Sequence, residues 1–133
     1  MEKLRVLVAE DHDSVRGILV SLLQSEFAVV ASVGDGKKLV KAAALLRPDV
    51  IVSDVLMPLK DGLAARAELL SMGIEVPFVF VTMMDPHLLS PLPETISYIH
   101  KSDLISELND SVRAVARGEI YLSRLFREMW GNP

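Results

Sequence analysis

Short apolar runs alternate with longer amphipathic segments along this chain. Runs rich in β-branched and aromatic residues predict five strands, at residues 4–9, 28–32, 50–53, 78–82 and 97–100. The third and fourth runs are almost wholly apolar, which is typical of strands that are covered on both faces. This alternation predicts βα units around a parallel sheet that is sandwiched between helices.

The segments between these runs carry apolar residues at helical spacing. They predict four helices, at residues 14–25, 37–46, 63–71 and 103–117. Asp13 or Ser14 is able to cap the first helix, and Gly118 suits a left-handed stop after the last one. The expected architecture is a doubly wound α/β fold with a five-stranded parallel sheet in the order 2-1-3-4-5.

Prolines interrupt the stretch between the fourth and fifth strands, where a further helix belongs. Pro86, Pro91 and Pro93 lie within residues 85–95, and each proline removes a backbone donor and restricts the residue before it. We therefore expect a shortened or irregular fourth helix of at most one or two turns. Residues 119–133 predict a short extended piece followed by a small amphipathic turn, which together form a C-terminal tail.

Length and charge narrow the class of protein. The 133 residues suit one domain, and the net charge of −4 at pH 7 argues against nucleic-acid binding by this chain itself, because phosphate contacts need a basic surface. The absence of cysteine excludes disulfides, thiol catalysis and the usual structural zinc patterns. The apolar stretch at 6–9 ends at Glu10, too short for a signal peptide or a membrane span, so we expect a cytoplasmic protein without membrane contact.

Acidic residues follow the predicted strands at the edge of the sheet where ligands bind. Glu10 and Asp11 follow the first strand and Asp54 follows the third, while Thr82 ends the fourth and Lys101 follows the fifth. Three carboxylates in one pocket repel one another unless a cation lies among them. An all-oxygen site of this kind suits Mg²⁺, so the sequence indicates a divalent ion.

These residues belong to stretches that resemble the receiver domain of response regulators, the CheY-like family. The resemblance covers the chain up to Gly118 and rests on the strings VLVAEDHDSVRGIL, RPDVIVSDVLMPLKDG, FVFVT and YIHKS. It is closest to the NarL/FixJ branch, whose receivers precede a LuxR-type helix-turn-helix. That branch typically has DH after the acidic pair, KS after the last strand, and a segment similar to AVARGEIYLS.

The resemblance implies a phosphoacceptor and a metal site. Asp54 would accept the phosphoryl group, with Mg²⁺, or Mn²⁺ as a substitute, bound next to it. Asp11 would be the main metal ligand, Glu10 would act partly through water, and Asp54 and the backbone carbonyl of Leu56 would complete the protein ligands. The charges of attacking carboxylate and donor must be neutralised, which the metal and Lys101 can do.

The same resemblance implies a switch. Thr82 would hydrogen-bond the phosphoryl group, and Lys101 would pair with it. Tyr98, three residues before Lys101, matches the aromatic switch of the family, whose ring turns inward when the threonine moves. Half-buried packing is the alternative role for this tyrosine.

Several positions depart from the family pattern. Glu10 replaces the commoner aspartate, and Met83 replaces a small residue next to the threonine, so its bulk is expected to narrow access to Asp54. Leu56 and Met84 flank the expected position of the attacking water. Both are apolar and cannot orient that water, so we expect slow hydrolysis and a long-lived aspartyl phosphate.

The resulting interpretation is a two-component receiver that is not an enzyme in its own right. A sensor histidine kinase or phosphotransfer protein would phosphorylate it, and the modified surface would change its affinity for an effector or for a second copy in a homodimer. Residues 1–118 would form the receiver, and 119–133 a tail or the start of a linker to an output domain that controls transcription and is absent here. One alternative is a phosphorylation-independent pseudo-receiver. The other is a small aspartate-nucleophile phosphatase, which is disfavoured because the sequence has no segment that could form a cap over a small substrate.

Overall fold

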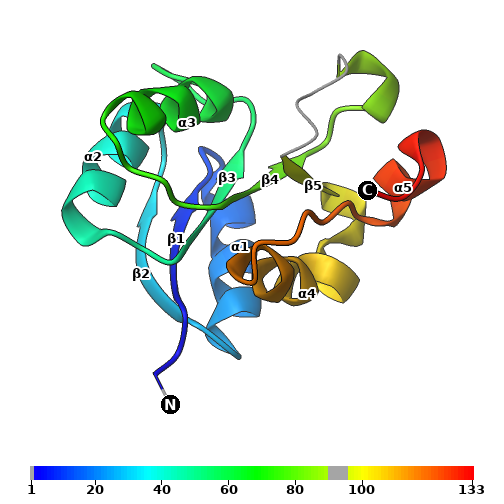
Figure 1. Cartoon of the computed structure of the whole chain (residues 1–133), viewed down its shortest axis with the longest axis horizontal. Helices are drawn as coiled ribbons and strands as arrows, with labels where there is room; N and C mark the ends of the chain where they lie inside the picture. Colours follow the sequence, from blue (N-terminus) through cyan, green and yellow to red (C-terminus); the bar gives the residue numbers. More distant parts are fainter. Residues whose placement is uncertain (1, 90–95) are drawn as a thin grey trace.

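One parallel sheet of five strands organises the protein, in a computed structural model that describes residues 2–89 and 96–133 (Figure 1). The strands are β1 (Arg5–Ala9), β2 (Ala28–Val33), β3 (Val50–Asp54), β4 (Phe78–Thr82) and β5 (Ser97–His100). Their spatial order is β2-β1-β3-β4-β5, and each neighbouring pair is parallel. The predicted fold class and strand order are confirmed.

Helices cover both faces of this sheet (Figure 1). They are α1 (Asp13–Gln24), α2 (Gly36–Leu46), α3 (Gly62–Ser71), α4 (Leu104–Ala116) and α5 (Arg124–Trp130), with short 3-10 turns η1 (Pro86–Leu88) and η2 (Lys101–Asp103). Helices α1 and α4 lie on one face, and α2 and α3 on the other. In the described ranges, none of the helices combines the length and the apolar character that crossing a membrane would need.

Alternation along β1 shows how the sheet builds two cores. Val6 and Val8 are fully buried against α1 and α4, whereas Leu7 and Ala9 are fully buried against α2 and α3. Successive strand side chains point to opposite faces, so a strand that is apolar at every position must be covered on both sides. The prediction that continuous apolar runs form strands covered on both faces of the sheet is therefore confirmed.

The start of α1 differs from the prediction. The N-cap position is His12, whose side chain makes no capping hydrogen bond, and the helix begins at Asp13. Asp13 instead accepts a hydrogen bond from Arg16 Nη2 at 2.6 Å. The prediction that Asp13 or Ser14 caps this helix is therefore wrong, because the Asp13 carboxylate is committed to a side chain within the first turn.

The proline-interrupted stretch contains one helical turn in its described part. η1 begins with Pro86, and the Asp85 side chain accepts a hydrogen bond from the His87 N–H at 2.9 Å. Proline tolerates this position because its missing N–H has no partner in a first turn. Pro91 and Pro93 lie outside the described residues, and the expectation for residues 90–95 stays untested.

The C-terminal segment runs along the outer edge of β5. The Tyr98 N–H donates to the Tyr121 carbonyl at 3.0 Å, and the Ser123 N–H donates to the Tyr98 carbonyl at 2.9 Å. Leu122 forms an isolated parallel bridge with Tyr98. The predicted extended piece thus satisfies backbone groups that an edge strand would otherwise leave unpaired.

Helix α5 then folds back over the aromatic side chain of β5. Phe126 and Tyr98 are both fully buried, with ring centroids 5.4 Å apart, and Phe80 lies 5.8 Å from Tyr98 on the other side. Trp130 meets Phe126 edge to face at 4.9 Å. Such contacts add to the free energy gained by burying large rings, so the tail segment contributes to the core.

Replacing Phe126 by alanine is expected to lower the free energy of unfolding by about 3 kcal/mol, through lost burial and the cavity that remains. Urea denaturation followed by circular dichroism measures this. Met129→Ala in the same helix is the control, because Met129 is 37% exposed. Equal losses in the two variants would show that α5 does not pack as described.

Glu107 on α4 holds the same segment through polar contacts. Its carboxylate accepts hydrogen bonds from the Tyr121 hydroxyl at 2.7 Å, the Arg124 backbone N–H at 2.9 Å and Arg127 Nη1 at 2.9 Å. Burial by itself would raise the pKa of Glu107, but these three donors and the charge of Arg127 outweigh burial and lower it below its ordinary value of 4.5.

This pKa shift predicts a pH dependence of stability. A carboxyl group whose pKa is lower in the folded state stabilises the fold above its unfolded-state pKa, and the contribution is lost as pH falls through the folded-state pKa. The stability difference between wild type and Glu107→Gln should therefore be largest near neutral pH and shrink below about pH 4.5. Urea unfolding across this range measures it, with the exposed Glu75→Gln as control. A difference that does not change with pH would contradict the assignment.

Candidate functional site

The carboxyl ends of β1, β3 and β5 bring three predicted site residues into contact. The Lys101 ammonium donates to Glu10 Oε1 at 2.6 Å and to Asp54 Oδ2 at 2.8 Å. Glu10 and Asp54 come from neighbouring strand ends, and Lys101 reaches them from the first position of η2. The structure therefore brings Glu10, Asp54 and Lys101 together in one pocket.

The charged groups of this pocket are largely shielded from water, so each charge costs free energy unless it is paired. Glu10 is fully buried, Asp54 is 7% exposed, and the Lys101 side chain is 12% exposed. Burial by itself would lower the pKa of Lys101, but its hydrogen bonds and attraction to Asp54 and Glu10 prevail and raise it. Two carboxylates and one ammonium leave one negative charge, so the cluster attracts a further cation.

The position of Asp11 fits such a cation. Its Oδ1 atom is buried and has no hydrogen-bond partner among the described residues. Ligand atoms of Glu10, Asp11 and His12 all lie within 4.8 Å of one another. Carboxylate oxygens are suitable ligands for a hard divalent ion. Such an ion would give Asp11 Oδ1 the partner that it lacks among the hydrogen bonds of the described residues.

His12, which the sequence analysis did not include in the site, lies next to this acidic pair. Its side chain is 70% exposed, and Nδ1 lies 3.3 Å from Asp11 Oδ1 and 3.4 Å from Glu10 Oε2. Among the described residues, Asp54 is not part of this group, and it pairs with Lys101. Glu10 takes part in both arrangements, because its Oε1 pairs with Lys101 and its carboxylate also lies close to Asp11 and His12.

Local packing fixes the backbone around Asp54. The Leu56 N–H donates to Asp54 Oδ1 at 3.2 Å, and Ser53 Oγ donates to the Asp54 carbonyl at 2.8 Å. A Cβ at Gly62 would lie 2.2 Å from that carbonyl and 2.9 Å from the Phe80 ring, so only glycine fits. The sequence analysis did not identify this close approach, because no short-range pattern reveals it.

Thr82 ends β4, and Met83 and Met84 follow it in the next loop. Thr82 is 1% exposed, and its Oγ1 accepts a hydrogen bond from the Met84 N–H at 3.0 Å. Within the described part of the chain, Thr82 and Asp54 are not hydrogen-bonded to each other. Met83 is 66% exposed and Leu56 is 60% exposed, so both apolar side chains project into solvent.

Tyr98 lies inside the protein, on the face covered by α2 and α3. It is fully buried, and among the described residues its hydroxyl finds no hydrogen-bond partner. Burial raises the pKa of Tyr98, and the Arg66 charge offsets only part of this. The half-buried alternative does not describe this ring.

His100 is a site neighbour that the sequence prediction missed. It is buried at the end of β5, next to Lys101. Its Nδ1 accepts from the Ser102 N–H at 3.2 Å, which leaves Nε2 as the protonated nitrogen and a donor to the Met83 carbonyl at 3.3 Å. This imidazole ties the loop after β4 to β5, a role that spacing in the sequence gave no means of detecting.

Comparison with known proteins agrees with this geometry. Residues 6–89 match the family described as the response regulator receiver domain. The chain is 31% identical over 121 residues to the transcriptional regulatory protein LiaR of Bacillus subtilis, covering 87% of this chain and 57% of LiaR. It is 34% identical over 128 residues to the response regulator GacA of Pseudomonas aeruginosa, covering 90% of this chain and 58% of GacA. The chain therefore spans less than two thirds of either relative.

The fold has a counterpart among solved structures. The signal receiver domain of the putative response regulator NarL from Mycobacterium tuberculosis superposes with a TM-score of 0.80 at 24% identity, covering 90% of this chain and all of that one. The family match spans most of the sheet and includes Glu10, Asp11, Asp54 and Thr82. This chain is therefore a receiver domain of the response-regulator family.

Proposed function

We propose that Asp54 accepts a phosphoryl group from a sensor histidine kinase or a phosphotransfer protein, in a reaction that requires Mg²⁺. The observation that carries this proposal is the contact of one ammonium, Lys101 Nζ, with both Asp54 and Glu10. The aspartate is buried enough to be held in place, and its 7% exposed fraction leaves a surface for the donor. The phosphorelay role of the receiver family agrees with this arrangement.

The reaction is a transfer between two nucleophiles. A carboxylate oxygen of Asp54 forms a bond to phosphorus, the phosphorus–nitrogen bond of the donor phosphohistidine breaks, and the electron pair stays on the imidazole, which takes up a proton. Lys101 stabilises negative charge on the phosphoryl oxygens, and Thr82 supplies a hydroxyl donor to the same group once it is released from Met84. This chain thus orients the acceptor and neutralises charge.

Asp11 is the main candidate for holding the metal ion. Its unpartnered Oδ1 supports this role, and Glu10 would assist partly through water. Asp54 and the Leu56 carbonyl would complete the protein ligands, with Mn²⁺ able to replace Mg²⁺. The bound ion supplies charge neutralisation between the acceptor carboxylate and the incoming phosphoryl group.

The consequence of phosphorylation would be a change in partner affinity. We propose Tyr98 and Thr82 as the switch residues, with a homodimer or an effector as the partner. Residues 1–118 would act as the receiver, and 119–133 as the start of a linker to an output domain that controls transcription. The chain would meet its kinase in the cytoplasm and would not bind nucleic acid by itself, in keeping with its net charge of −4.

A phosphorylation-independent pseudo-receiver is the second candidate. It is favoured by the exposed Met83 beside Thr82 and by the Lys101 contact, which already satisfies Asp54 without a phosphoryl group. In that role the protein would bind partners through the same surface in one fixed state.

Incubation with phosphoramidate and Mg²⁺ should add the mass of one phosphoryl group to the wild type and none to Asp54→Ala. Intact-mass spectrometry measures this, and chelation of the metal should abolish the gain. The mass should then persist for many minutes after the donor is removed, because Leu56 and Met84 cannot orient a hydrolytic water.

Two results would contradict this proposal. The first is a folded wild type that gains no phosphoryl group at any Mg²⁺ concentration, which favours the pseudo-receiver. The second is an equal gain in Asp54→Ala, which places the acceptor elsewhere. Asp49→Ala is a matched control, because Asp49 lies at the opposite end of β3 and accepts a hydrogen bond from the Arg5 N–H.

Met83→Ala is expected to raise the rate of phosphorylation by small donors several-fold, since Met83 directly follows Thr82 in the chain and alanine removes most of its bulk. The initial rate of the mass gain measures this effect. Leu88→Ala is the control, because Leu88 is a 72% exposed apolar residue of η1. Equal rates in wild type and Met83→Ala would exclude the methionine as a barrier.

A further inference from the structure

We propose that Glu10, Asp11 and His12 form a binding site for Zn²⁺, in which the His12 imidazole is the ligand that favours zinc over Mg²⁺. The three residues fill the connection between the end of β1 and the start of α1. Within the described ranges, they are the group of histidine and acidic side chains whose ligand atoms all lie within 4.8 Å of one another. Zinc binding at this group does not depend on the proposed phosphoacceptor function.

A buried oxygen without a partner points to a missing ion at this group. Asp11 Oδ1 is buried and has no hydrogen-bond partner among the described residues, although His12 Nδ1 lies 3.3 Å away. The same Nδ1 atom lies 3.4 Å from Glu10 Oε2. Leaving a buried carboxylate oxygen unpaired costs free energy, and a bond to a metal ion would remove that cost.

The spacing of these atoms matches the edges of a zinc tetrahedron. Zinc binds nitrogen and carboxylate oxygen at about 2.0–2.1 Å, so two ligands at the tetrahedral angle lie about 3.3–3.4 Å apart. Two neighbouring ligands of octahedral Mg²⁺ would lie about 2.9 Å apart. The distances from His12 Nδ1 to the carboxylate oxygens of Asp11 and Glu10 are 3.3 Å and 3.4 Å, in agreement with the tetrahedral value.

The backbone holds His12 beside the carboxylates. The His12 N–H donates to Glu10 Oε2 at 3.2 Å, while Glu10 Oε1 accepts from Lys101 Nζ at 2.6 Å. His12 is the N-cap residue of α1, but its side chain makes no capping hydrogen bond. The ring is therefore not used by the helix, and its 70% exposed side chain leaves the site open to ions from solvent.

The charge of the surrounding pocket also favours a divalent ion. Glu10, Asp11 and Asp54 are three carboxylates, and Lys101 contributes one ammonium to the same cluster. These four groups carry a formal charge of −2 when all are ionised. One Zn²⁺ would neutralise this charge, and neutralisation is worth most where the groups are shielded from water, as Glu10 and Asp54 are.

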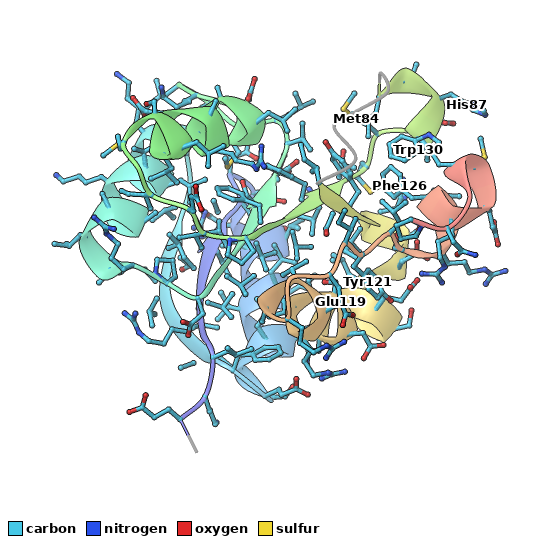
Figure 2. All side chains as sticks on the ribbon, viewed as in Figure 1. Met84, His87, Glu119, Tyr121, Phe126 and Trp130 are labelled. Atoms are coloured by element: carbon cyan, nitrogen blue, oxygen red, sulfur yellow. The ribbon has the colours of Figure 1, made fainter. Side chains whose placement is uncertain are left out.

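The imidazole sets the preference among metals. Mg²⁺ binds oxygen ligands, whereas imidazole is a good ligand for zinc. The chain has three histidines and no cysteine. His100 uses Nδ1 for the Ser102 N–H and Nε2 for the Met83 carbonyl, and His87 is exposed on η1 beside α5 (Figure 2). In the described part of the chain, His12 is thus the histidine that lies next to two carboxylates with Nδ1 facing them.

Zinc at this group would compete with phosphorylation. Asp11 is the main candidate ligand for the Mg²⁺ that phosphoryl transfer requires, and the proposed zinc site uses the same carboxylate. A bound zinc ion would therefore withhold Asp11 from Mg²⁺ and slow the reaction at Asp54. This consequence, unlike zinc binding itself, rests on the proposed function.

Calorimetric titration of the full chain tests the site. His12→Asn replaces the nitrogen ligand by an amide oxygen, so it should bind Zn²⁺ several-fold more weakly than wild type and Mg²⁺ with nearly the same affinity. His87→Asn is the matched control and should bind zinc as wild type does. Equal zinc affinity in wild type and His12→Asn, an equal loss for both metals, or no zinc binding by wild type would overturn the inference.

Nuclear magnetic resonance identifies the ligand atom. Long-range proton–nitrogen spectra resolve the ring nitrogens of the three histidines, and zinc should shift the Nδ1 signal of His12. A shift confined to His87 or His100, or no shift at any ring, would overturn the assignment.

Phosphorylation with phosphoramidate and Mg²⁺ tests the competition separately. Equimolar Zn²⁺ should slow the mass gain of wild type several-fold and that of His12→Asn much less, each compared with the same protein without zinc. Equal slowing of the two proteins would overturn the competition. A wild type that binds zinc but gains no phosphoryl group in its absence would overturn the proposed function and leave the zinc site intact.

Discussion

The bridge that Lys101 makes between Glu10 and Asp54 joins the carboxyl ends of three strands, β1, β3 and β5. Each of these charges would be costly in its buried position without the others, because removing ions from water is repaid only by close pairing. The cluster keeps a net negative charge, and the unpartnered oxygen of Asp11 lies beside it. The same arrangement that stabilises the closed pocket therefore leaves it ready for a cation and for a phosphoryl group, both of which must compete with existing contacts.

The second constraint is that β5 lies at the edge of the sheet and must be covered. An edge strand offers unpaired backbone groups, and here the segment at 121–123 pairs with them. Burial of Tyr98 then requires an apolar cover, and Phe126 supplies it from α5. Polar fastenings from Asp103 and Glu107 hold this short helix, which would be marginal in isolation because seven residues cannot offset the cost of helix nucleation.

These two features meet in η2. Lys101 contacts the acidic pocket, and Asp103 contacts α5. The single three-residue turn η2 therefore links the pocket to the covering helix. Packed elements of this kind tend to occupy discrete arrangements and to resist gradual deformation.

The sequence by itself determined the sheet and the main candidate residues. Continuous apolar runs specified strands covered on both faces, and acidic residues at their ends specified the pocket, because strand ends of a parallel sheet meet at one edge. Local chemistry misled at α1, where Asp13 pairs with Arg16 and caps nothing. The tertiary structure alone decided the close approach at Gly62, the bridging role of His100, the burial of Tyr98 and the capping of α5 by Asp103. These depend on contacts between different elements of the chain, and periodicity carries no information about such contacts because it records only which face of its own element a residue occupies.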